Sequence, residues 1–182
     1  MKKIVLTYGL ISGVISAALM SATVPFVYSI GFEYGMYIGY SAMLVAFLLV
    51  FFGVRAYREN VLDGYIGFWR ALGVGLLISM ISIVCYVVAW EIVYYNFLPD
   101  FADKYSAYIM EKERNSGASA EQLAAKLEEV AFMKRVLANP IWNALVTFTE
   151  PLPVALPVSI ISALILRRKP RAQTAGQQPA VV

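Results

Sequence analysis

The stretch FWRALGVGLLISMISIVCYVVAWEIVYY (residues 68–95) holds only two charged side chains, Arg70 and Glu91, in 28 residues. As a helix rising 1.5 Å per residue it exceeds the ~30 Å needed to cross the hydrocarbon core of a bilayer. Three further apolar runs of similar length lie at about 4–30, 34–56 and 141–166. The sequence therefore predicts an all-α membrane protein with four transmembrane helices.

The composition agrees with this prediction and narrows the chemistry. Hydrophobic residues make up 60% of the 182 residues and charged residues 15%, against roughly 25% charged in soluble domains. The chain has no histidine, which removes the usual acid/base group and zinc or haem ligand. Its single cysteine, Cys85, has no partner for an internal disulfide. We expect no enzyme activity, no cofactor or metal, and no nucleic-acid partner.

The positions of the basic residues predict how the chain is threaded, because Lys and Arg are retained on the cytoplasmic side. They flank the predicted helices on one side of the membrane: Lys2, Lys3, Arg55, Arg58, Arg70, Arg167, Arg168, Lys169 and Arg171. The first apolar run continues to Ile30, well beyond the 7–15 residues of a secretory signal core. We therefore expect an uncleaved first helix, a multipass protein and both termini in the cytoplasm.

The segment 99–139 lies outside the membrane in this arrangement and has mixed charge. Its apolar residues follow helical spacing in two stretches, which are separated by Asn115, Ser116 and Gly117. Ser119 and Gln122 form a capping-box pattern at the start of the second stretch. We predict two short amphipathic helices within a transmembrane domain of residues 1–169, followed by a disordered cytoplasmic tail at 170–182.

Small residues recur at intervals of four in three of the predicted membrane helices: Gly9, Gly13, Ala17 and Ser21; Gly35 and Gly39; Ala71 and Gly75. Because lipid tails are as apolar as leucine, membrane helices associate through close packing of such residues. The pattern favours packing within one chain over a homodimer face, which is the alternative.

The stretch TFTEPLPVALPVS (residues 147–159) places a carboxyl and three prolines inside the last predicted helix. Glu150 lies ten residues from the outer end at Pro140, about 15 Å, and Glu91 lies eight residues from Pro99, about 12 Å. We therefore expect Glu91 and Glu150 at similar depth in the membrane. Glu33 is expected above them, in the connection between the first and second predicted helices. These three residues form the candidate intramembrane acidic site.

Three interpretations of the intramembrane carboxyls are open, since a charged group at membrane depth is costly. The carboxyls are protonated and bonded to neighbours such as Thr147, Thr149 or Tyr94, or they hold a cation or proton pathway. In the third interpretation they pair with Lys134 or Arg135 of the external segment. Proline also removes backbone donors, so Pro151 leaves the Thr147 carbonyl without its helical partner. The interruption is either a structural kink or part of a site.

Several stretches together resemble an uncharacterised bacterial membrane-protein family, domain of unknown function 4199. They are YGLISG (8–13), AFLLVFFGVRAYRE (46–59), LPDFADKY (98–105), NPIW (139–142) and EPLPVALPVSIISALILRRK (150–169). The resemblance implies a multipass protein of the bacterial inner membrane with an external segment before the last helix. It implies no activity and no site residues.

Two functions fit these observations. The first is a small ion- or proton-linked transport component with an outward-facing acidic cavity formed by Glu33, Glu91 and Glu150. The second is a non-catalytic membrane module that assembles with itself, as a homo-oligomer, or with another membrane protein in the lipid bilayer. Four helices are few to enclose a pathway, so the first function would also require oligomerisation.

Overall fold

The computed structural model describes residues 1–168, and its helices follow in this order: α1 (Lys2–Thr23), η1 (Val24–Phe26), α2 (Val27–Ile30), α3 (Phe32–Val61), α4 (Phe68–Phe97), α5 (Phe101–Asn115), α6 (Ala120–Ala138), α7 (Pro140–Thr149) and α8 (Leu152–Leu166). Within this part of the chain the β-structure amounts to one isolated bridge between Ile66 and Arg168. The tail predicted at 170–182 lies outside the described residues.

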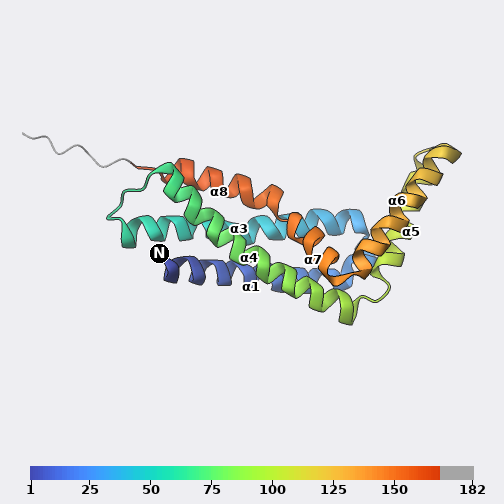
Figure 1. The fold of residues 1–182 in the computed structure, drawn as a ribbon, viewed down its shortest axis with the longest axis horizontal. Helices are drawn as coiled ribbons and strands as arrows, with labels where there is room; N and C mark the ends of the chain where they lie inside the picture. The colour runs from blue at the N-terminus through green and yellow to red at the C-terminus, as the bar shows by residue number, and fades with distance from the viewer. Residues whose placement is uncertain (169–182) are drawn as a thin grey trace, which may run out of the picture.

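Four helical stretches are long and apolar enough to cross a membrane, which confirms the predicted class: Lys2–Ile30, Phe32–Val61, Phe68–Phe97 and Pro140–Leu166. Figure 1 shows them side by side as an elongated bundle, with α5 and α6 extending from one end. We call this end the hairpin end, and the opposite end, where α1 begins, the N-terminal end. Along the bundle α1 and α4 run in one direction and α3, α7 and α8 in the other.

The first span is interrupted, where the sequence predicted one helix over 4–30. Pro25 lacks an N–H donor, and the chain passes through the short helix η1 before α2. Gly31 then turns the chain into α3 with φ of 88°, a conformation that favours glycine. The second helix continues to Val61, beyond the apolar run that ends at 56, and Arg55 and Glu59 form an ion pair one turn apart in this extension.

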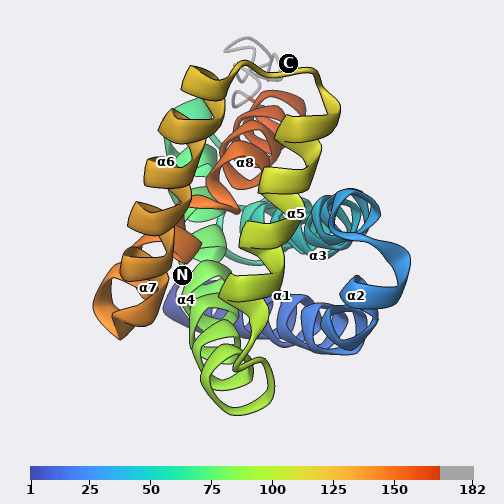
Figure 2. The ribbon, with the colours of Figure 1, turned by 90° about the vertical axis from the view of Figure 1, so that its right-hand side faces the viewer.

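The external segment forms the two predicted helices. The backbone N–H of Ser119 donates to Gln122 Oε1 (2.8 Å) and that of Gln122 donates to Ser119 Oγ (3.2 Å), so the predicted capping box is formed. Gly117 makes the turn before it with φ of 80°. Figure 2, in which the hairpin end faces the viewer, shows α5 and α6 side by side in front of the bundle.

The parallel helices α1 and α4 are in close contact at two glycines. A Cβ atom on Gly9 would lie 2.8 Å from Ile81 Cβ, and one on Gly13 would lie 2.6 Å from Cys85 Cβ. Gly75 of α4 packs in a similar way against Ser159 of α8, at 3.3 Å. These glycines are therefore used within the chain, as predicted. A Cβ on Gly39, by contrast, would meet nothing within 4 Å.

Buried hydroxyl groups add hydrogen bonds between the helices. Ser12 shares a hydrogen bond of 3.0 Å with Ser82 and donates to the carbonyl of Ala46 (2.9 Å), so it joins α1 to both α4 and α3. Ser79 and Ser159 share one of 3.2 Å between α4 and α8. Each such bond between membrane helices contributes about 0.6 kcal/mol on average, so they supplement close packing.

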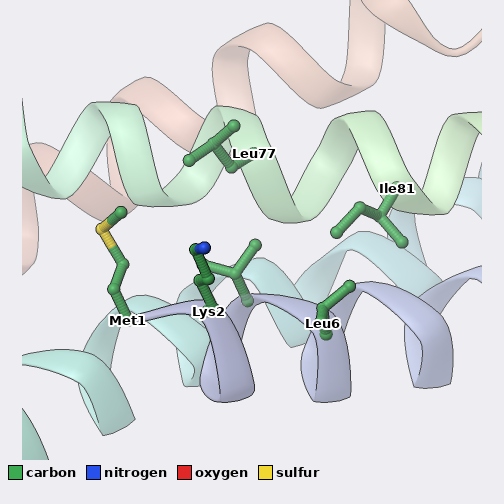
Figure 3. Close-up of a pocket in the computed structure, with 6 residues that line it drawn as sticks. Met1, Lys2, Leu6, Leu77 and Ile81 are labelled. Atoms are coloured by element: carbon green, nitrogen blue, oxygen red, sulfur yellow. The ribbon is translucent and has the colours of Figure 1, made fainter.

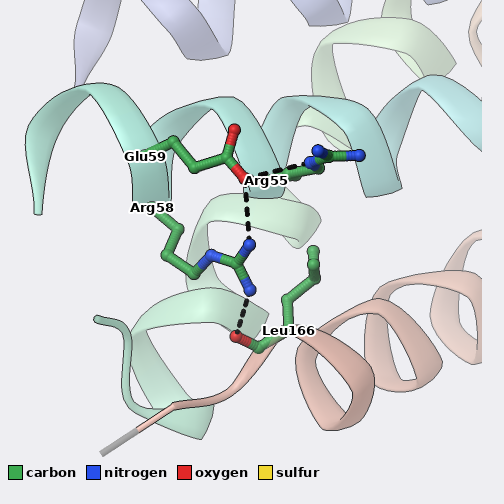
Figure 4. A network of polar contacts seen from close by, with 4 residues as sticks. All are labelled: Arg55, Arg58, Glu59 and Leu166. Carbon is green, nitrogen blue, oxygen red and sulfur yellow. Dashed lines mark hydrogen bonds and ion pairs between the residues drawn. The ribbon is translucent and has the colours of Figure 1, made fainter. Parts of the chain in front are cut away.

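A buried arginine of α3 binds the C-terminal end of α8, which lies at the N-terminal end of the bundle. Arg58 is 7% exposed, and its Nη1 donates to the Leu166 carbonyl (3.2 Å) at the end of α8. Its Nη2 donates to Glu59 Oε1 (3.0 Å), which also accepts from Arg55 Nε (3.0 Å), as Figure 4 shows. Ile66 and Arg168 exchange two backbone hydrogen bonds beside this network. The α3–α4 connection and Arg58 thus fix the end of α8.

The contrast between Gly13 and Gly39 gives a test of the packing. We expect Gly13→Ala to lower the free energy of unfolding by about 1–3 kcal/mol, because its methyl group would overlap the Cβ of Cys85, which is fixed to the α4 backbone. Gly39→Ala should be neutral or stabilise by up to about 1 kcal/mol through helix propensity. Reversible unfolding in mixed detergent micelles would measure both, and equal stability of the two variants would contradict the packing described.

Candidate functional site around Glu150

The last span is broken at Glu150, as the prolines predicted. α7 ends at Thr149 and α8 begins at Leu152, with Glu150 and Pro151 between them. The N–H of Glu150 donates to the Thr147 carbonyl (3.2 Å), which compensates for the donor that Pro151 lacks. The interruption therefore leaves the Thr147 carbonyl satisfied, and Glu150 keeps right-handed helical backbone angles (φ of −60°, ψ of −44°).

Glu150 is exposed, although its carboxyl lies against the buried side chain of Tyr86. Its Oε2 accepts one long hydrogen bond, 3.4 Å, from the hydroxyl of Tyr86 on α4. Two of the neighbours expected from the sequence make other bonds, because Thr147 donates to Asn143 Oδ1 (3.3 Å) and Thr149 to the Val146 carbonyl (2.7 Å). The third, Tyr94, packs its ring against Trp90 and Phe101. The expected partners of Glu150 are thus corrected to Tyr86.

Glu91 and Glu150 are not brought together by a hydrogen bond. Glu91 is half-buried, and its Oε1 has no hydrogen-bond partner among the described residues. Tyr86, the residue that contacts Glu150, lies five residues before Glu91 on α4, which is about 7.5 Å along the axis and about 140° around it. Counting from helix ends predicted similar depth but could not give the rotation about the helix axis.

Glu33 lies at the start of α3 and faces the hairpin. Its Oε2 accepts from Lys112 Nζ (3.4 Å) and from the Tyr108 hydroxyl (3.5 Å), both on α5. The Glu33 carboxylate raises the pKa of Lys112 through this hydrogen bond. Similarly, the hydrogen bond from Lys104 holds the pKa of Asp100 below its ordinary value.

The basic residues proposed as partners of the intramembrane carboxyls lie elsewhere. Lys134 of α6 forms an ion pair with Asp103 of α5, so it links the two hairpin helices. Arg135 makes no ion pair with any carboxylate in the part of the chain that is described. Because α5 and α6 are antiparallel neighbours, Lys134 faces α5 and pairs with the carboxylate of Asp103 there rather than with Glu150.

Aromatic side chains attach the hairpin to the bundle. The Phe32 ring lies 5.2–6.0 Å from four other rings, those of Tyr28, Phe101, Tyr105 and Tyr108. Phe101 also contacts Trp90 of α4, with ring centroids 5.4 Å apart. Burial raises the pKa of Tyr105, and nearby Tyr108 and Glu150 raise it further.

Asn143 is a polar residue of this region that the sequence analysis missed. It is fully buried, and its Oδ1 accepts from Trp90 Nε1 (3.1 Å) and from Thr147 Oγ1 (3.3 Å), while its Nδ2 has no partner in the described chain. Asn143, Thr147 and Glu150 follow helical spacing along α7. That spacing of three polar residues in an apolar helix was the signal that could have identified it.

The fold and this region define a multipass integral membrane protein with four helices able to span the membrane and a helical hairpin at one end of the bundle. The chain belongs to the family described as Protein of unknown function (DUF4199), whose family model matches residues 7–168. No curated protein and no solved structure matches it. The description of the family assigns no reaction and no ligand to the region around Glu150.

A double-mutant cycle can test the contact between Trp90 and Asn143. We expect Trp90→Phe and Asn143→Leu to show a coupling free energy of about 0.6–1.7 kcal/mol, the range for hydrogen bonds between membrane helices. Unfolding of the two single variants and the double variant in detergent would measure it. Trp69→Phe is the control because Trp69 is 79% exposed, and it should show no coupling to Asn143. Strict additivity of Trp90→Phe and Asn143→Leu would contradict the contact.

Proposed function

We propose that the protein is a non-catalytic membrane subunit that assembles with another membrane protein through the Glu150 face. This face is the stripe of exposed residues at helical spacing on α7 and the start of α8: Trp142, Val146, Thr149, Glu150 and Pro153. The observation that carries the proposal is the exposure of Glu150 within the fourth membrane-spanning stretch.

The energy of the carboxyl supports an assembled state. An acidic group at the centre of a spanning helix costs roughly 2.5–3.5 kcal/mol on insertion scales. A carboxylate has about four acceptor positions, and within the described chain Glu150 receives one hydrogen bond, the long one from Tyr86. A partner that donates to the remaining positions would offset much of this cost.

The chemistry of the face indicates what kind of partner fits it. Residues 141–166 contain no lysine or arginine, so a cationic donor has to come from outside the last span. A second copy of the chain that presented the same face would place a second carboxyl beside the first and would bring no cation. A different membrane protein with a basic, hydroxyl or amide side chain at this depth therefore fits the Glu150 face best.

Cross-linking in native membranes tests this proposal. In a Cys85→Ala background, a photo-cross-linker on Val146→Cys should capture a protein of another mass, because Val146 lies one turn before Glu150 on the exposed face. Adding Glu150→Leu should reduce the yield about tenfold or more, since a hydrogen bond to a charged group contributes about 1.5–3 kcal/mol. The Glu150→Leu chain should still fold, because the substitution removes a carboxyl from the membrane.

The matched control for this experiment is Val88→Cys on α4. Val88 is 53% exposed and lies about 200° around the helix from Tyr86, away from Glu150. It should capture no defined product that depends on Glu150. Recovery of the monomer alone at Val146→Cys would contradict the proposal, and a product of twice the chain's mass would contradict the choice of a different partner.

A second candidate function is the ion- or proton-linked transport component. It is favoured by two buried groups without partners in the described chain, the acceptor Glu91 Oε1 and the donor Asn143 Nδ2. Such groups inside a membrane protein are typical of positions that hold water or pass protons. The two surface hollows next to α1 are lined by none of Glu33, Glu91 and Glu150, so an acidic cavity formed by all three is less well supported.

Proteoliposomes with an imposed pH gradient separate the two functions. If the chain transports protons or cations, Glu91→Gln and Glu150→Gln should abolish the gradient-dependent signal, while Glu128→Gln on the exposed side of α6 should leave it unchanged. Under the assembly proposal the purified wild-type chain gives no signal above empty vesicles. A signal that persists in both the Glu91 and Glu150 variants would contradict transport through these residues.

A further inference from the structure

An apolar hollow of about 300 Å³ lies between α1 and α4 near the N-terminal end. Figure 3 shows it from close by, with Leu77 and Ile81 on α4 facing Met1, Lys2 and Leu6 on α1. Val5 completes the lining. Apart from Lys2, every lining side chain is apolar, and Leu6 and Leu77 are each about half exposed on the outside of the bundle.

The hollow follows from how the two parallel helices pack. The two helices are in close contact where Gly9 of α1 meets Ile81 of α4. Because the helices are parallel, the first turn of α1, which begins seven residues before Gly9, lies at the level of residues 71–74 of α4. A Cβ on Gly73 would meet nothing within 4 Å, so no neighbouring group fills the space beside it. The helices are therefore tightly joined above the hollow and leave an open apolar surface at this level.

Positive charge gathers at the end of the hollow nearest the membrane surface. Lys2 lines it, Lys3 is next in the chain, and Arg70 shares a stripe of α4 with Leu77, seven residues later. Arg70 donates to the Tyr57 hydroxyl (3.0 Å). Within residues 1–168 no carboxylate forms an ion pair with Lys2, Lys3 or Arg70. These charges are therefore not neutralised by a carboxylate of the described residues.

We propose that this hollow binds an anionic phospholipid, with one acyl chain along Leu6, Leu77 and Ile81 and the phosphate against Lys2 and Arg70. The arrangement of charged and apolar residues matches that of a phospholipid, since the cations lie at the helix ends and the apolar residues lie deeper along the spans. Basic groups beside apolar surface between membrane helices favour anionic headgroups. This inference is independent of assembly through the Glu150 face, which lies on α7 and α8.

Native mass spectrometry of the purified chain, titrated with phosphatidylglycerol or with phosphatidylcholine, tests the proposal. We expect the first phosphatidylglycerol to bind more tightly than phosphatidylcholine. Lys2→Gln should weaken phosphatidylglycerol about fivefold, the effect of one lysine near an anionic headgroup, and leave phosphatidylcholine unchanged. Lys126→Gln on the external hairpin is the charge-matched control and should change neither.

A filled hollow should weaken both lipids. Leu77→Trp places a larger side chain in the space, and Leu6→Trp does the same from α1 if the first variant folds poorly. Leu164→Trp on α8 is the control, because Leu164 is 45% exposed against 48% for Leu77 and lies in another helix near the same end. Weakened binding in the two hollow variants, with normal binding in the control, would support the proposal.

Three results would overturn it. Phosphatidylglycerol binding that is unchanged in Lys2→Gln would remove the role of the charge. Loss of binding in Lys2→Gln with full binding in both hollow variants would show headgroup attraction at the surface without an acyl chain in the hollow. A dimer in the same spectra that dissociates on Leu77→Trp would assign the hollow to a second copy of the chain.

Discussion

The close approach of α1 and α4 is the constraint on which the rest of the bundle depends. In a bilayer the apolar side chains gain little by leaving lipid for protein, so helices stay together only where their backbones come near enough for extensive contact. Gly9 and Gly13 provide that approach, and it places Ser12 where it can bond to Ser82 and to the carbonyl of Ala46. α3 is thereby fixed to the same pair, and α8 packs in turn against α3 and α4.

The sequence predicted the features that depend on length and hydropathy. Four spans, the two external helices and the capping box at Ser119 were confirmed, because each follows from a pattern within a few consecutive residues. The interruption at Pro25 was not predicted, although the proline was visible, because a proline within an apolar run is compatible with a continuous kinked helix. Local patterns thus gave the elements but not the bends within them.

The candidate site was predicted less completely. The sequence identified Glu150 and the break beside it, but its partner Tyr86 lies 64 residues away, and such a pair depends on how α4 and α7 are rotated against each other. Lys134 was considered for Glu150 because it is near in sequence, yet the antiparallel hairpin brings it to Asp103. Distance along a helix can be counted from the sequence, whereas direction around the helix comes only from packing.

The network of Arg58 bears on the order in which the chain can complete its fold. Arg58 and the Leu166 carbonyl are separated by 108 residues, and the bridge between Ile66 and Arg168 also needs the end of α8. A chain still being synthesised therefore has three inserted helices whose arginine lacks this acceptor. Only insertion of the last span supplies these contacts, so this end of the bundle is completed last, and a chain that stopped before α8 would leave Arg58 without its carbonyl acceptor.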